Sequence, residues 1–301
     1  MPDFHGFRDY LLARDLAPAT VRGYLADLEA FGRWFEQTNG EVLTPAAVTP
    51  TDVREYRGWL QRRGLKAATV NRRLNALRAW LDWARGAGLV EDNPAAGVRQ
   101  VRAVKPAPRW LDRRERYALQ RAAERVLQTA RAAGGKRWVN HTRDALLVLF
   151  LLHTGLRVGE VVALTEDDLT LRPRSGQVLV RRGKGNKQRV VPLNAEARKA
   201  VKRWLETRGE TGITAAVLWS VGKGLTARTV QRAVERVAHE AKLDGVTPHV
   251  LRHTFAKSLI DAGAGLQEVA ELLGHGDLNT TRRYVQPDGR DLTRAVEALV
   301  G

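Results

Sequence analysis

Apolar residues in the first 90 positions recur every three or four residues, which is the period of amphipathic helices. Within residues 17–35, Val21, Leu28 and Phe31 fall on one face, after an Ala-Pro-Ala-Thr start signal. A later Thr-Pro-Thr-Asp sequence opens another helix, and Gly64 closes it. The pattern predicts four helices, at residues 3–13, 17–35, 49–63 and 66–85.

The rest of the chain combines the same helical period with one alternating stretch. Residues 177–182 and 188–193 read as strands, and Lys184 lies between Gly183 and Gly185 in their connection, which predicts a β-hairpin. Further helices are predicted at 112–132, 140–152, 194–208 and 226–242, from Arg157 onward and from Thr247 onward. The predicted fold class is therefore mainly α with a small β-hairpin.

A break in the helical pattern divides the chain into two parts. Asp92-Asn93-Pro94 ends the first bundle, and residues 98–109 contain two prolines, several basic residues and little apolar periodicity. We predict an N-terminal helical domain at 1–100, a linker at 101–109 and a second domain at 110–301.

The charge predicts a polyanionic partner. The chain carries 50 Lys and Arg against 33 Asp and Glu, a formal net charge of +17, and residues 104–301 hold 35 against 21, a net of +14. Nucleic acid is the simplest partner, and an anionic membrane surface is the alternative. The longest apolar run, 145–152, is far shorter than the roughly 18–20 residues that span a bilayer. With no cysteine and no signal-peptide order, we expect a cytoplasmic protein without disulfides or membrane spans.

The stretch from 247 to 285 concentrates chemically active side chains. It contains His249, Arg252, His275 and Tyr284. The first two are three residues apart on one predicted helix, so we expect them on one face. Arginine binds phosphate oxygens with a planar charged fork, histidine transfers protons near neutral pH, and tyrosine can act as a covalent nucleophile. Each residue taken alone is also compatible with a structural role.

Arg157 and Lys184 add two further cationic positions. Arg157 follows Gly155 at a predicted helix start, where free backbone N–H groups also favour an anion. Glu160, three residues on, is placed to orient it. Lys184 sits at the predicted hairpin tip, from which a lysine can reach into a groove. The alternatives are that Arg157 is an ordinary surface arginine and that Lys184 is a solvated loop lysine.

Two predicted helices each carry several basic residues on a face that lies outside the apolar pattern. Phosphate contacts require only such charge along a helix, so both faces are predicted to bind DNA, with a solvated surface as the alternative. The residues concerned are Lys66, Arg72, Arg73 and Arg78 on the helix at 66–85, and Arg228, Arg232 and Arg236 on the helix at 226–242.

Together these elements resemble the tyrosine recombinase, or phage integrase, family in order and spacing. The matching residues are Arg157 in TGLRVGE, Lys184 at the hairpin tip, His249 and Arg252 in HVLRH, His275 in LLGHGDLNTT and Tyr284 in RRYV. The N-terminal helices resemble the core-binding domain of that family. Overall length and the short tail make the chain most similar to the Xer branch. The resemblance implies two domains that form a C-shaped clamp on DNA.

The chemistry implied by the resemblance is a transesterification at a DNA phosphate. Tyr284 would attack the phosphorus, giving a 3′-phosphotyrosyl link and a free 5′-hydroxyl. Arg157 and Arg252 would hold the non-bridging oxygens and stabilise the charge of the transition state. Lys184 would protonate the leaving 5′-oxygen.

The remaining matched positions would support this step. His249 would act as acid or base, His275 would bind the phosphate or position Tyr284, and Glu160 would support the site structurally. No cofactor is implied. The link to Tyr284 would conserve the bond energy, so neither a metal ion nor ATP would be required.

The resemblance also implies partners. The substrate would be double-stranded DNA with two half-sites, bound by a homo- or hetero-tetramer whose contacts include a C-terminal exchange helix within 285–301. A DNA translocase is a further expected partner, and the role would be resolution of chromosome or plasmid dimers by a nucleoid-associated enzyme. The alternatives are an integrase or transposase of a mobile element, a type IB topoisomerase-like enzyme and a non-catalytic DNA-binding regulator.

Overall fold

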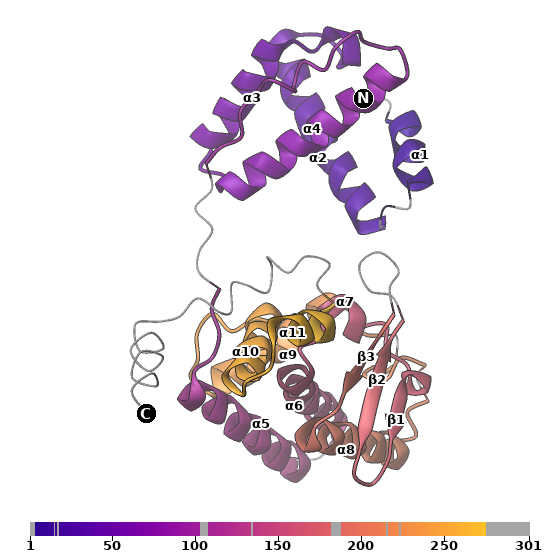
Figure 1. The fold of residues 1–301 in the computed structure, drawn as a ribbon, viewed down its shortest axis with the longest axis vertical. Coiled ribbons are helices and arrows are strands. Elements are labelled where there is room, and N and C mark those ends of the chain that lie inside the picture. Colours follow the sequence, from indigo (N-terminus) through magenta and orange to yellow (C-terminus); the bar gives the residue numbers. More distant parts are fainter. Residues whose placement is uncertain are drawn as a thin grey trace. The chain divides into compact units, whose positions relative to one another are not determined.

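The chain folds into two compact units, divided between residues 106 and 107 (Figure 1). The computed structural model describes residues 4–14, 16, 18–102, 108–133, 135–181, 188–214, 216–222 and 224–274. The predicted domain limits and the predicted clamp around DNA stay predictions.

The first unit is a helical bundle with an aromatic core. Phe7, Phe31, Phe35, Tyr56 and Trp80 are each at most 2% exposed. Burial of such large rings, together with the aliphatic residues around them, stabilises the bundle. The four predicted helices are confirmed within a few residues: α1 is His5–Ala13, α2 Pro18–Asn39, α3 Pro50–Arg62 and α4 Ala67–Gly86, with a 3₁₀ turn at Pro45–Ala47.

The start of α3 shows why the sequence signal worked. Thr49 is the N-cap residue, and its hydroxyl accepts a hydrogen bond from the backbone N–H of Asp52 at 3.2 Å. The carboxylate of Asp52 accepts the backbone N–H of Thr49 at 2.8 Å in return. This reciprocal capping box satisfies two N–H groups that the first helical turn leaves unpaired.

The second unit is built around one buried helix, α6 (Gly135–Thr154) (Figure 1). Its residues 145–152 are all at most 8% exposed, and it packs against four surrounding helices. These are α5 (Arg113–Ala133), α8 (Ala195–Thr211), α9 (Ala227–Glu240) and α10 (Pro248–Asp261). The predicted start of α6 at residue 140 was too late: Val139 is buried and Trp138 packs against the core, so the apolar face begins earlier.

A three-stranded antiparallel sheet adjoins these helices (Figure 1). The predicted hairpin is confirmed as β2 (Gly176–Val180) and β3 (Arg189–Pro192), with Val178 opposite Val191. The edge strand β1 (Leu169–Leu171) was not predicted, because three residues are too short for an alternating pattern and only its pairing with β2 defines it. A 3₁₀ turn, Glu166–Asp168, precedes it.

Two further short helices belong to the described part of the second unit. Helix α7 (Val158–Val161) follows α6 after a turn of three residues, and α11 (Leu266–Leu273) follows α10. Helix α11 packs against α10 and β3. Within the described part of the chain, no helix is long and apolar enough to cross a membrane.

Candidate active site

The turn between α6 and α7 begins with a glycine that no other residue can replace without strain. Gly155 has φ +61°, and a Cβ atom at this position would lie 2.4 Å from Cδ1 of Phe255. The left-handed backbone and the close approach of α10 both exclude a side chain. The turn thereby directs the Gly155 carbonyl toward α10 and places Arg157 at the N-cap of α7.

Arg157 is oriented by Glu160, as the three-residue spacing predicted. The carboxylate of Glu160 accepts the Arg157 backbone N–H at 2.8 Å and its Nη1 at 2.9 Å. Nη2 of Arg157 donates to the carbonyl of Gly274 at 2.8 Å. The Arg157 side chain is still 31% exposed, so its guanidinium is accessible to an anion from solvent.

Arg252 lies on α10 and is almost completely buried, with 4% of its surface exposed. Its Nη1 donates to the carbonyl of Gly155 and its Nη2 to that of Leu273, both at 2.6 Å. The side chain therefore connects the α6–α7 turn to the end of α11. A buried guanidinium held by two carbonyls stays charged and keeps one orientation.

The C-terminal end of α11 is where these arginines converge. Gly274 ends the helix in the left-handed conformation, with φ +64°. The carbonyls of Leu272, Leu273 and Gly274 accept hydrogen bonds from Arg189, Arg252 and Arg157 respectively. The last carbonyls of a helix lack partners within it and carry its negative dipole end, so three guanidinium groups stabilise this terminus.

Arg189 is the residue of this cluster that sequence reasoning missed. It is the first residue of β3, its side chain is 9% exposed, and both of its terminal nitrogens donate to Glu160 at 2.8 Å. A signal was present: Arg189 is two residues before the buried Val191, so strand alternation places both on one face. An arginine at an inward strand position requires a buried acidic partner.

Glu160 is ionised at the centre of the cluster. Its side chain is 4% exposed. Burial raises the pKa of Glu160, but the hydrogen bonds from Arg189 and Arg157 and the charge of Arg189 outweigh burial and hold that pKa below its ordinary value. The carboxylate therefore acts as the common anchor of two arginines.

The other predicted catalytic residues are placed differently. His249 is exposed in the first turn of α10, whereas Arg252, three residues later, is buried, so the two do not share one environment. Lys184, His275 and Tyr284 lie outside the described residues. The structure thus brings together Arg157, Glu160 and Arg252, and the placement of Lys184, His275 and Tyr284 stays a prediction.

The basic residues predicted on α4 have unequal surroundings. Lys66 is exposed at the N-cap. Arg72 and Arg73 both form ion pairs with the buried Asp27 on α2. Arg78 donates to the carbonyls of Ala95 and Val98, and so holds the segment after α4 in place.

The basic residues predicted on α9 also differ. Arg228 and Arg232 are exposed and form no ion pair with any residue in the described ranges. Arg236 instead forms an ion pair with Asp144, which is buried on α6. Of this stripe, two arginines are therefore available for an external anion.

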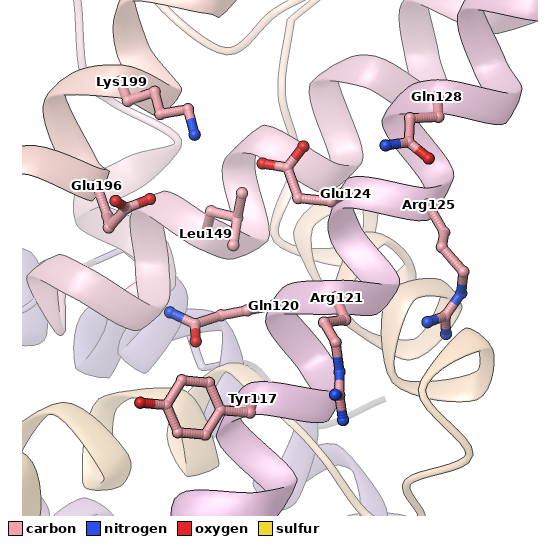
Figure 2. A pocket seen from close by; sticks show the side chains of 9 residues that line it. All are labelled: Tyr117, Gln120, Arg121, Glu124, Arg125, Gln128, Leu149, Glu196 and Lys199. Atoms are coloured by element: carbon pink, nitrogen blue, oxygen red, sulfur yellow. The ribbon is translucent and has the colours of Figure 1, made fainter.

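A separate cavity lies between α5 and α8 (Figure 2). Figure 2 shows charged groups of both signs around it, and two of them are paired: Glu124 with Arg203 at 3.2 Å and Arg125 with Glu240 at 3.2 Å. A mixed and paired lining does not favour a polyanion. The arginine cluster at the end of α11, and not this cavity, is the candidate active site. The cavity residues are Tyr117, Gln120, Arg121, Glu124, Arg125, Gln128, Leu149, Glu196 and Lys199.

Comparison with known proteins identifies the family. Residues 119–290 match the model of the phage integrase family, and residues 4–88 match that of the phage integrase N-terminal SAM-like domain. Tyrosine recombinase XerC of Corynebacterium glutamicum is 32% identical over 295 residues, which is 97% of this chain and 89% of the relative. XerC of Xylella fastidiosa strain M23 is 32% identical over 298 residues, covering 98% and 95% of the two chains.

Solved structures agree with this assignment. XerH site-specific recombinase bound to its difH substrate before cleavage matches with a TM-score of 0.71 and 25% identity, over 94% of this chain and 81% of that one. The Tn1549 transposon integrase bound to transposon right end DNA shares the fold, with a TM-score of 0.70 and 22% identity, over 97% and 98% of the two chains. The matched models, relatives and structures place this chain in the phage integrase family, as a tyrosine recombinase of the Xer branch.

Proposed function

We propose that this chain recombines double-stranded DNA at a specific site by forming a 3′-phosphotyrosyl link through Tyr284. The observation that carries the proposal is the convergence of Arg157 and Arg252 on the carbonyls of Leu273 and Gly274. These carbonyls directly precede His275, and Tyr284 follows nine residues later. The predicted nucleophile is therefore attached to the helix end that the two arginines hold.

The proposed step balances without a cofactor. Oη of Tyr284 forms a bond to the scissile phosphorus, and the bond from phosphorus to the 5′-oxygen breaks. His249, the proposed acid or base, accepts the phenolic proton of Tyr284 in this step, and Lys184 supplies the proton to the leaving 5′-oxygen. His275 binds the phosphate or positions Tyr284. Arg157 and Arg252 hold the non-bridging oxygens and stabilise the charge that grows on them. The 5′-hydroxyl of another strand reverses the step, so neither ATP nor a metal ion takes part in the proposal.

The arrangement of subunits follows from the same chemistry. Two duplexes with two half-sites each require four copies of Tyr284, so the proposal includes a homo- or hetero-tetramer in which the C-terminal helix contacts the neighbouring copy. We propose resolution of chromosome or plasmid dimers as the role, with a DNA translocase as a partner. Relatives of the XerC type, at 32% identity, favour this role over integration of a mobile element.

The test is to capture DNA covalently joined to the protein in cells of the source organism and to sequence it. We expect one site to be recovered from the wild type, and none from the Tyr284→Phe variant, which lacks the nucleophilic oxygen. A single site near the replication terminus supports dimer resolution, whereas sites at the ends of a mobile element support an integrase. No captured DNA above the Tyr284→Phe background, at equal expression, contradicts the proposal.

We further propose that Arg228 and Arg232 contact the DNA backbone. Each phosphate contact releases counterions, so log affinity falls as log salt concentration rises. Replacing both residues by glutamine should make this negative slope less steep by about 2, with little change in preference among sequences. Fluorescence anisotropy over a salt series measures this slope. Arg121→Gln, which removes one exposed charge on α5, is the control and should leave the slope unchanged. Equal slopes for the double variant and the wild type would exclude the contact.

A further inference from the structure

The ion pair between Arg157 and Glu160 poses an electrostatic problem. Glu160 orients Arg157 with two hydrogen bonds, at 2.8 and 2.9 Å. A carboxylate that close also cancels the charge of the guanidinium, and the cancellation is strong because Glu160 is buried. Taken alone, the pair is neutral and attracts a phosphate only weakly. Orientation and charge are thus in conflict at this position.

Arg189 resolves this conflict. Its two terminal nitrogens form a fork on the same carboxylate, with Nη1 on Oε1 and Nη2 on Oε2, each at 2.8 Å. The group of Arg157, Glu160 and Arg189 then carries a net charge of +1. Arg189 is 9% exposed and Arg157 is 31% exposed, so the accessible part of this charge is on Arg157.

Arg189 also connects the strand to the helix end. Its Nε donates to the carbonyl of Leu272 at 2.8 Å. The side chain packs so closely on Gly274 that a Cβ atom there would lie 2.9 Å from Nη1. One side chain therefore contacts Glu160, the last turn of α11 and the residue before His275.

We propose that Arg189 is a positioning residue for DNA cleavage: it balances the charge of Glu160, which leaves Arg157 positive, and it holds the end of α11 that leads to His275 and Tyr284. This inference rests on the proposed function. It assigns to Arg189 no contact with DNA or with the reacting atoms.

The test compares Arg189→Gln, Arg189→Lys, Glu160→Gln and the double variant Arg189→Gln/Glu160→Gln. Single-turnover formation of the covalent complex is measured on a nicked duplex that carries the captured site, and affinity for the same duplex is measured separately. Arg189→Gln is expected to slow cleavage about 100-fold, the effect typical of losing one preorganised electrostatic group, with affinity changed less than about 3-fold. Arg189→Lys keeps the charge but not the fork, and an intermediate rate is expected.

The double variant separates charge balance from packing. Removing the negative charge of Glu160 should restore about 10-fold of the rate lost in Arg189→Gln. A purely structural role predicts that the double variant is no faster than Arg189→Gln. The matched control is the Arg203–Glu124 pair, 3.2 Å apart on α8 and α5, whose glutamine variants should cleave within about 3-fold of the wild type. Melting curves establish that each variant is folded.

Hydrogen–deuterium exchange tests the positioning role without cleavage. Amides near the end of α11, residues 271–274, should exchange faster in Arg189→Gln than in the wild type, with residues of α9 unchanged. Unchanged exchange, or a double variant no faster than Arg189→Gln, overturns the inference. If the wild type forms no covalent complex, the proposed function fails, and exchange at the end of α11 alone decides whether Arg189 positions it.

Discussion

Replacing Arg252 by alanine is expected to reduce covalent DNA cleavage by about 10²–10³-fold, because one of the two arginines proposed to hold the phosphate is lost. Stability should fall as well. The two hydrogen bonds of Arg252, both 2.6 Å, satisfy the buried carbonyls of Gly155 and Leu273. Losing hydrogen bonds to a charged group and leaving these carbonyls unpaired should cost about 3–5 kcal/mol of unfolding free energy. Urea unfolding and single-turnover cleavage measure the two effects.

A matched control separates the catalytic loss from the structural loss. Arg208 is also 4% exposed and also donates to a backbone carbonyl, that of Leu218, but it lies on α8 and forms its ion pair with Glu166, which is not part of the arginine cluster. Arg208→Ala should therefore lower stability while cleavage, measured well below the melting temperature, stays near the wild-type rate. Arg252→Lys keeps the charge without the planar fork and is expected to remain impaired. Near-normal cleavage by Arg252→Ala would remove this residue from the proposed chemistry.

Gly155→Ala is expected to destabilise the second unit by about 2–5 kcal/mol. A left-handed backbone costs a residue with a side chain roughly 1–2 kcal/mol, and overpacking a core adds roughly 1–3 kcal/mol. Here the new methyl group would lie 2.4 Å from Cδ1 of Phe255 and 3.2 Å from Cδ2 of Leu273. Relief of this clash must shift the turn that carries the Gly155 carbonyl toward Arg252. Thermal unfolding should show a melting temperature lower by roughly 5–15 °C.

Gly159 provides the control for this substitution. It lies four residues later in α7, and a Cβ atom there would meet nothing within 4 Å. Gly159→Ala should therefore be neutral or stabilise the protein by up to about 1 kcal/mol, since alanine favours helix. If Gly155→Ala and Gly159→Ala have the same melting temperature, a side chain is not excluded at Gly155.

The sequence predicted the helices well because their signals are local. An apolar face every 3.6 residues, a capping sequence such as Thr49 to Asp52 and a closing glycine each act within one or two turns. The early start of α6 and the strand β1 were missed for the complementary reason. Trp138 and Val139 become part of a helix face by packing on the core, and β1 exists through its pairing with β2.

The site was only partly accessible to sequence reasoning. Arg157, Glu160 and Arg252 were identified because they lie in short motifs whose order resembles a family. Arg189 was not identified, since the strand alternation that places it on the inward face of β3 does not show which acidic residue it pairs with. Similarly, Arg78 and Arg236 were predicted on charged outer faces. In the structure Arg78 donates to the carbonyls of Ala95 and Val98, and Arg236 forms an ion pair with Asp144.

The amino-acid sequence by itself determined the mainly helical class, the basic character and the presence of a tyrosine recombinase set, because each follows from residue type and local spacing. Tertiary structure alone decided that Arg157, Arg189 and Arg252, from the α6–α7 turn, β3 and α10, meet at the last carbonyls of α11. The spacing of these three arginines along the sequence does not predict that they lie close together. They do so in the folded chain because buried guanidinium groups and buried helix carbonyls need hydrogen-bond partners in place of water.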